Sequence, residues 1–186
     1  LLFDLLAVLL GYLKISLTFA LMLLLYGLVS KAYSHPGIRL KKYAITGWII
    51  TGLFQGLFTF AMCYIGINKF PLEQAMKAKI LIPGMLTCFM LWANYPMTQV
   101  YQHEEDSKRG DRTFSLMLGI RGTFYFAIGF FTIAMAGFFL YLKIYVEIKY
   151  AWVFLAALGP VLIYFLFWFG KVLKDEKYAD HPHTMR

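Results

Sequence analysis

The sequence predicts an all-α, multi-pass transmembrane helical bundle, and two observations carry that prediction. First, 60% of the 186 residues are hydrophobic and only 15% are charged, whereas soluble domains have roughly 45–50% apolar and about 25% charged residues. Second, apolar stretches recur along the chain with lengths near the roughly 20 residues that cross a hydrocarbon core about 30 Å thick. Together they exclude a soluble globular domain, a disordered segment and a disulfide-stapled secreted module.

We expect about six spans separated by polar connections. The first stretch, Leu1–Leu13, is shorter than a full span, which needs about 17–25 residues. The break around Gly11 and Lys14 leaves two readings open for residues 1–30, either two helices or one kinked helix. The remaining expected spans are Ile15–Ser30, Ala44–Ile67, Ile80–Val100, Gly122–Leu142 and Ala151–Gly170.

The basic residues follow the alternation of the connections. The net charge is +8, and of the 18 Lys and Arg residues twelve fall on one side of the expected bundle and six on the other. The smaller set comprises Lys14, Lys69, Lys77, Lys79, Lys143 and Lys149. Because cytoplasmic loops carry an excess of Lys and Arg, the larger set is predicted to face the cytoplasm, together with the acid-rich loop at 102–113. The cations are scattered over several loops rather than gathered on one face, so no nucleic-acid partner is expected.

One stretch differs from the rest of the chain. The expected span that ends near Val100 becomes polar over its last two turns and continues into three acids at positions 104–106. On a helix, one i, i+4 stripe would comprise Asn94, Thr98, Gln102 and Asp106. A polar amide inside the bilayer is costly unless it faces protein or a wet cavity, so the stripe is predicted to line a cavity that opens to the cytoplasm. Gly110 is placed to end this helix.

Spacing alone leaves two readings of the acids open. In one, they belong to a solvated loop in which Glu105 pairs with Arg109 at i, i+4. In the other, they are magnesium ligands, because Mg²⁺ prefers oxygen donors and is usually held by one or two carboxylates plus a substrate phosphate. The cations that would then hold the remaining phosphate charge are Lys108, Arg109 and Arg112.

A second segment, residues 33–42, follows the second expected span and lies on the same side as the acids. One reading is a Pro-Gly turn that carries the positive charge of a cytoplasmic loop. The other reading is a tyrosine and a set of cations beside an anionic substrate. His35 is predicted to be a turn or interface residue rather than a ligand.

Both segments resemble motifs of one family. The run from Gln102 to Gly119 is similar to an aspartate-rich motif that reads approximately D-x-E-x-D-x-x-x-G-x-x-T-x-x-x-x-x-G. The residues in register are Glu104, Asp106, Gly110, Thr113 and Gly119. The run from Tyr33 to Lys41 resembles Y-S-x-P-x-x-R-L-K. In this order, within a multi-helix membrane chain, the two motifs resemble those of the UbiA superfamily of intramembrane prenyltransferases, and with their flanking helices they cover most of the chain.

The resemblance implies a bundle of nine transmembrane helices around a central cavity, of which residues 1–186 form the C-terminal part as a single membrane domain. It implies transfer of a prenyl group from a prenyl diphosphate to an aromatic or other small-molecule acceptor of a lipid pathway, in contact with membrane lipid. Two aspartate-rich motifs would bind Mg²⁺ and the diphosphate. Paired metals and cations would stabilise the charge that develops on the leaving diphosphate.

The resemblance also implies roles for individual residues. Asp106 is expected to be catalytic and is the best-matched magnesium ligand, with Glu104 or Glu105 as an accessory acid. Tyr33 is expected near the acceptor or the leaving group. The expected metal ligands are Asp106, Glu104 and Gln102. Together with the polar stripe, the resemblance gives the expected substrate-binding residues Lys108, Arg112, Ser34, Arg39, Lys41, Gln102 and Asn94.

Two departures from the family pattern leave a second function open. Gln102 stands where the motif has its leading aspartate, and no N-D-x-x-D motif occurs in the 186 residues. We therefore expect a piece of a longer protein that lacks the first two or so helices and the last one. The alternative is a non-catalytic UbiA-like membrane protein that binds a polyprenyl lipid or a partner. A transporter is disfavoured, because the sequence shows neither charges near the bilayer midplane nor inverted repeats.

Overall fold

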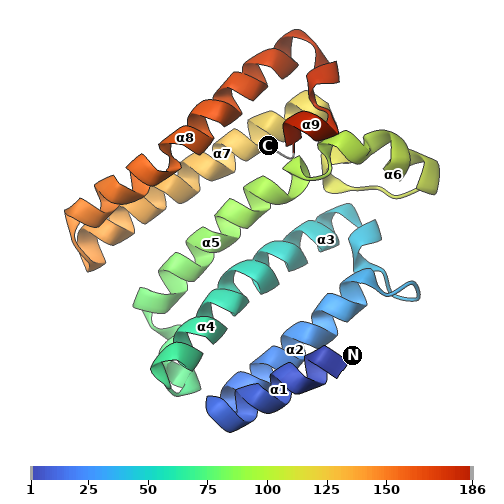
Figure 1. Cartoon of the computed structure of the whole chain (residues 1–186). Coiled ribbons are helices and arrows are strands. Elements are labelled where there is room, and N and C mark those ends of the chain that lie inside the picture. Colours follow the sequence, from blue (N-terminus) through green and yellow to red (C-terminus); the bar gives the residue numbers. More distant parts are fainter. Residues whose placement is uncertain (1, 185–186) are drawn as a thin grey trace.

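The computed structural model describes residues 2–184, which form helices joined by short connections and contain no β-strand (Figure 1). Leu1 of the first expected span and Arg186 of the larger cation set lie outside the described residues. The α-helices are α1 (Leu2–Lys14), α2 (Leu17–Ser34), α3 (Ala44–Thr51), α4 (Thr59–Asn68), α5 (Ala78–Met97), α6 (His103–Arg109), α7 (Phe114–Tyr145), α8 (Ile148–Lys174) and α9 (His181–Thr184). A π-helical turn, η2 (Gly52–Phe58), joins α3 to α4. The 3₁₀ turns are η1 (Leu40–Lys42), η3 (Leu72–Met76), η4 (Val100–Gln102) and η5 (Glu176–Tyr178).

Five stretches of the described chain are long and apolar enough to cross a membrane. They are Leu17–Ser34, Ala44–Asn68, Ala78–Arg109, Phe114–Tyr145 and Ile148–Lys174. Each contains most of one expected span, and α1, with 13 residues, is the partial span expected before them. The prediction of an all-α, multi-pass bundle is confirmed.

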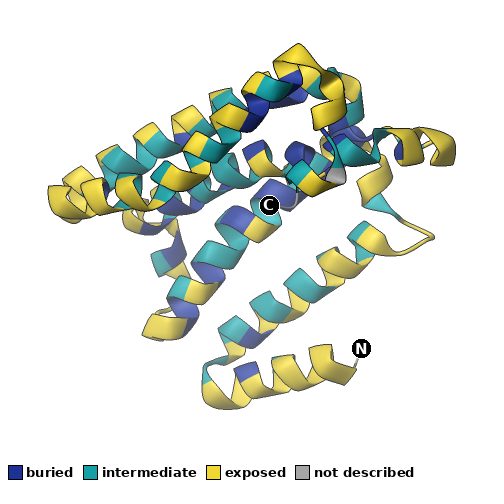
Figure 2. Ribbon diagram, turned by 45° about the horizontal axis from the view of Figure 1, so that its top comes forward, coloured by how far each residue is buried: buried dark blue, intermediate teal, exposed yellow. Residues whose placement is uncertain are grey.

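The first 30 residues form two helices rather than one kinked helix. Ser16 has an extended backbone between them, and its hydroxyl accepts a hydrogen bond from the Phe19 amide at 3.1 Å, which caps the start of α2. α1 then lies along α2, with the Lys31 ammonium 2.9 Å from the Asp4 carboxylate. Figure 2 shows that α1 is exposed over most of its length, whereas buried residues concentrate on the central helices.

The span α3–η2–α4 packs closely against α5 at a glycine. A Cβ atom added to Gly56 would lie 2.8 Å from both the Cα and the backbone nitrogen of Cys88. Within the π-helical turn, the Leu57 amide donates to the Cys88 sulfur at 3.1 Å. A widened turn of this kind re-aims backbone groups toward a neighbouring helix. Gly56 therefore sets how near the two spans can come.

α7 bends at Gly119, which has φ 70° and ψ 171° inside an otherwise helical run. This conformation has positive φ, which glycine adopts without the Cβ penalty of other residues. The bend separates a short N-terminal turn from the long part that crosses beside α5 and α8. That long part packs with them around a core of Met97, Val100, Phe124, Ala127, Trp168, Phe169, Val172 and Ala179.

The connections lie at two ends of the bundle (Figure 1). The α2–α3 connection, α6 and α9 lie at one end, and the α1–α2, α4–α5 and α7–α8 connections lie at the other. The described members of the two cation sets predicted from the loops therefore occupy opposite ends (Figure 1). The membrane side that each end faces stays a prediction.

Candidate functional site

The polar end of α5 borders two adjoining hollows. The larger, of about 450 Å³, lies between α5, α7 and α8 and is mostly apolar. The smaller, of about 250 Å³, lies between α2, α3 and α5. Asn94 and Thr98 line both, so we treat the two hollows as one inner chamber. The lining residues used below are Tyr33, Gln55, Asn94, Met97, Thr98, Phe131, Tyr164 and Trp168.

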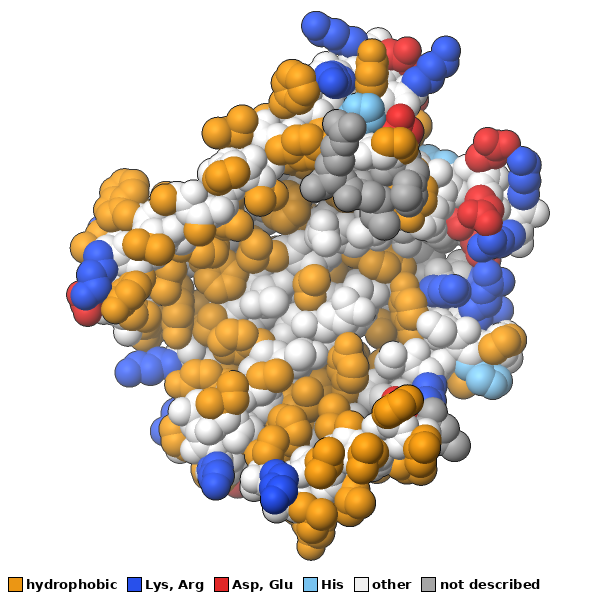
Figure 3. Space-filling view, viewed as in Figure 1, with side chains coloured by type: hydrophobic (Ala, Val, Ile, Leu, Met, Phe, Trp, Pro, Cys, Tyr) orange, Lys and Arg blue, Asp and Glu red, His pale blue; other side chains and the backbone are white. Residues whose placement is uncertain are grey.

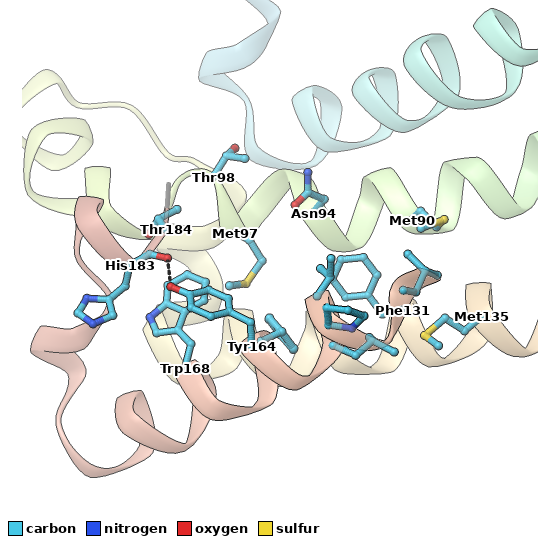
Figure 4. Close-up of a pocket in the computed structure, with 15 residues that line it drawn as sticks. Met90, Asn94, Met97, Thr98, Phe131, Met135, Tyr164, Trp168, His183 and Thr184 are labelled. Carbon is cyan, nitrogen blue, oxygen red and sulfur yellow. Dashed lines mark hydrogen bonds between the residues drawn. The ribbon is translucent and has the colours of Figure 1, made fainter. Parts of the chain in front are cut away.

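Figure 4 shows how the side chains of the larger hollow are arranged. Met97 points from α5 toward Tyr164 and Trp168 of α8, while Asn94 and Thr98 lie along α5 at the border with the smaller hollow. The hollow is thus apolar and aromatic in its depth and polar at one edge. Such a combination suits a ligand with a hydrocarbon body and a polar end.

Tyr33 reaches the inner chamber from α2. Its hydroxyl lies 2.6 Å from the hydroxyl of Tyr95 on α5. Tyr33 and Asn94, both predicted from the sequence as site residues, line the same smaller hollow. Ser34, the last residue of α2, is exposed, and so is Lys41 in η1. Sequence reasoning missed Tyr95, because it lies outside the i, i+4 stripe.

The predicted polar stripe does not continue along one helix, so that expectation is wrong. α5 ends at Met97, and α6 starts only at His103. The Thr98 hydroxyl donates to the carbonyl of Tyr95 at 2.7 Å, a local bond that competes with helix continuation. Asn94 and Thr98 consequently line the chamber, while Gln102 and Asp106 are not among its lining residues.

Pro96, in the last turn of α5, removes one helical hydrogen bond without ending the helix. Proline has no amide hydrogen, so the carbonyl of Trp92 four residues earlier loses its helical partner. That carbonyl accepts a hydrogen bond from the Trp48 indole at 3.0 Å instead. A neighbouring span thus satisfies the freed backbone group, as a membrane interior requires.

Asp106 is buried at the polar end of the bundle, with 6% of its surface exposed. Its Oδ2 atom and the hydroxyl oxygen of Thr113 are both buried, and the Thr113 hydroxyl interacts with the Asp106 carboxylate in a geometry too poor for a full hydrogen bond within residues 2–184. A buried carboxylate oxygen with so weak a donor is costly. These two oxygens are therefore suited to bind a group that residues 2–184 do not supply. Oxygen atoms of this kind are the ligands that Mg²⁺ prefers.

The other expected metal ligands lie differently. Glu104 pairs with Lys108 at 2.7 Å, and Glu105 pairs with Arg109, as the solvated-loop reading predicts. The side chains of Glu104 and Glu105 are 84% and 62% exposed. The Gln102 amide donates to the Tyr101 hydroxyl at 2.7 Å.

Across residues 2–184, no group of three or more His, Cys, Asp and Glu side chains could hold a metal ion. Among the three ligands expected from the sequence, Asp106 alone is buried. The fit to Mg²⁺ therefore rests on this one carboxylate, whose remaining partners would be water and phosphate oxygens.

A buried polar network holds the segment that carries Asp106. His103 Nε2 lies 2.7 Å from the Ser115 hydroxyl, which lies 2.9 Å from the Thr123 hydroxyl. The Ser115 amide donates to the side-chain oxygen of Gln99 at 3.3 Å. Sequence reasoning missed this network, because only the bend at Gly119 brings Ser115 and Thr123 together. It ties η4 and α6 to the start of α7.

The two motif segments meet at an ion pair. The Arg39 guanidinium lies 2.8 Å from the Asp111 carboxylate, with side chains 32% and 11% exposed. Next to it, the backbones of Tyr43 and Arg112 form an isolated parallel bridge. The α2–α3 connection is thereby joined to the loop that follows α6. Gly110 ends α6 with φ 72°, as predicted.

The residues after α8 fold back over one end of the larger hollow. The Trp168 indole donates to the Tyr178 carbonyl at 2.7 Å, and the Tyr164 hydroxyl donates to the His183 carbonyl at 3.0 Å (Figure 4). His183 Nδ1 lies 2.6 Å from the Asp180 carboxylate, and this hydrogen bond lowers the pKa of Asp180. Because His183 and Thr184 line the hollow, this C-terminal segment forms part of its wall.

Comparison with known proteins gives one match. The sequence profile of the UbiA prenyltransferase family matches residues 1–185. No curated protein and no solved structure matches the chain at a significant level. The profile includes both motif segments and every helix described above, so the resemblance seen in the sequence is confirmed. The chain belongs to the UbiA prenyltransferase family.

Proposed function

We propose that the protein containing this chain moves a prenyl group from a prenyl diphosphate to a small acceptor of a lipid pathway, inside the inner chamber. Family membership supports prenyl transfer in general. The observation that carries the proposal for this chain is the buried carboxylate of Asp106, whose Oδ2 atom lacks a hydrogen bond of good geometry among residues 2–184 and which lies at the same end of the bundle as the polar edge of the chamber (Figure 1). We place the acid-rich end in the cytoplasm on the distribution of Lys and Arg.

The chamber's chemistry suits the reaction. The allylic C–O bond of the donor breaks, diphosphate leaves with the electron pair, and the allylic carbon bonds to the acceptor, which loses a proton. The rings of Phe131, Tyr164 and Trp168 exclude water from the carbocation and present π-faces that stabilise positive charge. Asn94 and Thr98 at the polar edge would orient the end of the substrate that carries oxygen.

The proposed cofactor is Mg²⁺, which UbiA prenyltransferases generally use. Asp106 would be its ligand from this chain, and Mg²⁺ commonly completes its shell with water and substrate phosphates. When bound, it supplies positive charge against the leaving diphosphate. Glu104, Glu105 and Gln102 could join it only after breaking the pairs described above.

The remaining proposed roles follow the positions of the side chains. Tyr33 lies inside the chamber and would contact the acceptor or the donor's oxygens. Lys108 is exposed on α6 and could approach a diphosphate beside Asp106. The expected contacts from Ser34, Arg39, Lys41 and Arg112 remain proposals, because these side chains lie outside the chamber's lining.

One alternative has a specific observation in its favour. Gln102 replaces a motif carboxylate, and Glu104 and Glu105 point into solvent. A non-catalytic UbiA-like protein that holds a polyprenyl lipid or a partner would need neither metal charge nor turnover. Binding without metal dependence is what separates this function from the first.

The test uses the full-length protein in lipid nanodiscs with a radiolabelled prenyl diphosphate and a panel of aromatic acceptors. We expect labelled product to form with Mg²⁺ and to disappear when EDTA removes it. Equal binding of the donor with and without Mg²⁺, and no product with any acceptor, would instead establish the non-catalytic alternative.

A further inference from the structure

A third hollow, of about 590 Å³, lies at the polar end of the bundle, and we call it the outer cleft. It is formed by the η1–α3 junction and the loop from α6 to α7, and it shares no lining residue with the inner chamber. The residues of the α3–η2 span that line the outer cleft include Ile45 and Thr46, whereas Thr51 and Gln55 of that span line the inner chamber. Ile45 and Thr51 are about a third of a helical turn apart in direction, so the two hollows face different ways.

The outer cleft carries an excess of positive charge. Its basic lining residues are Arg39, Lys42, Arg109 and Arg112, and its single acid, Asp111, already pairs with Arg39. Arg109 pairs with Glu105. Lys42 and Arg112 are exposed and form no ion pair among residues 2–184, and the Lys42 ammonium lies 4.9 Å from the centre of the Tyr43 ring. Figure 3 shows Lys and Arg gathered beside α6 and the α2–α3 connection.

The border of the cleft is apolar. Ile45 and Met117 are 54% and 59% exposed, and Tyr43 is 52% exposed. They lie where α3 and α7 begin, which is where these spans enter the membrane if their apolar lengths cross it. Tyrosine is typical of that interface. Two unpaired cations above exposed apolar side chains match a molecule with an anionic head and hydrocarbon chains.

We propose that the outer cleft binds an anionic phospholipid of the surrounding bilayer. Lys42 and Arg112 contact the headgroup phosphate, since Lys and Arg side chains bind phosphate through charge-assisted hydrogen bonds. Ile45 and Met117 contact the upper part of the acyl chains. Cytoplasmic loops in general carry an excess of Lys and Arg, which sets the orientation of a protein in the membrane. That general excess does not explain why this cleft combines two cations that form no ion pair within the described residues with an apolar border. This inference does not depend on prenyl transfer, and it assigns Arg112 to the phospholipid in place of the diphosphate contact expected from the family resemblance.

The test is retention of lipid by the full-length protein in neutral detergent, measured by native mass spectrometry after incubation with equal amounts of phosphatidylglycerol and phosphatidylcholine. We expect the wild type to retain about tenfold more phosphatidylglycerol than phosphatidylcholine. Two cations at the membrane surface can supply a preference of this size. The double variant Lys42→Gln/Arg112→Gln is expected to lose that preference. Lys69→Gln/Lys77→Gln removes the same charge at the opposite end of the bundle and is expected to keep it.

Two further arms make the result decisive. Lys42→Arg/Arg112→Lys keeps both charges and is expected to retain phosphatidylglycerol, which separates loss of charge from loss of fold. Equal retention by the wild type and Lys42→Gln/Arg112→Gln would overturn the proposal. A second result would also overturn the proposal. If inorganic phosphate raises the Tm of the wild type as much as phosphatidylglycerol does, and Lys42→Gln/Arg112→Gln abolishes that rise, the cleft recognises free phosphate.

Discussion

Replacing Asp106 by Asn in the full-length protein is expected to lower kcat for prenyl transfer by at least about a hundredfold, the range seen when charge stabilisation of a transition state is removed. The substitution keeps the size of a side chain that is 6% exposed. It removes the negative charge that the proposed Mg²⁺ would take from this chain, and an amide oxygen is a weaker ligand for a hard cation. The measurement is single-turnover transfer of a labelled prenyl group over a series of Mg²⁺ concentrations.

A matched control comes from the opposite end of the bundle. Glu147→Gln also removes one negative charge, and Glu147 pairs there with Lys149 at 2.8 Å on an exposed surface. We expect this variant to keep wild-type kcat and the wild-type Mg²⁺ requirement. Asp106→Asn should also raise the Mg²⁺ concentration that gives half-maximal rate, which a purely structural role would leave unchanged. Wild-type turnover in Asp106→Asn would remove Asp106 from the site.

Gly56→Val is expected to lower the free energy of unfolding by about 1–3 kcal/mol, the usual cost of overpacking a close contact. Its Cβ would meet the Cα and the backbone nitrogen of Cys88 at 2.8 Å, and backbone atoms cannot rotate away as a side chain can. The α3–η2–α4 span would therefore separate from α5, and the wall of the smaller hollow would move with it. Thermal unfolding in detergent, followed by circular dichroism, measures the loss.

Gly27→Val provides the comparison for that experiment. Gly27 lies on α2, and nothing lies within 4 Å of a Cβ added there. We expect a change of no more than about 0.5 kcal/mol, as for most substitutions without such contacts. If the two variants unfold at the same temperature, the close approach of Gly56 to Cys88 does not exist in the protein.

The spans were predictable because bilayer thickness sets a length that apolar runs must match. The expected spans Ala44–Ile67 and Ala151–Gly170 each fall inside one observed stretch. The number of helices before Ser30 was not predictable from hydropathy. It depended on the cap that the Ser16 hydroxyl gives to a backbone amide. A local bond of this kind leaves little mark on composition.

The site was predictable in part. Asn94 was placed in a cavity from the cost of burying an amide in lipid, and it lines one. The stripe through Asp106 failed because α5 ends at Met97, where the Thr98 hydroxyl bonds back to the Tyr95 carbonyl, and the spacing of the polar residues does not mark that end. The ion pair between Arg39 and Asp111 spans 72 positions. Such pairings depend on how loops fold together, which spacing within one motif does not reveal.

Photocrosslinking with a prenyl diphosphate that carries a diazirine in its hydrocarbon chain tests most directly whether the inner chamber holds the donor. In the full-length protein with Mg²⁺, we predict that the label attaches to Met97, Phe131 or Tyr164 and that unlabelled prenyl diphosphate competes it away. Label confined to Ile45 and Met117 of the outer cleft, or to α1, with none in the chamber, would contradict that prediction.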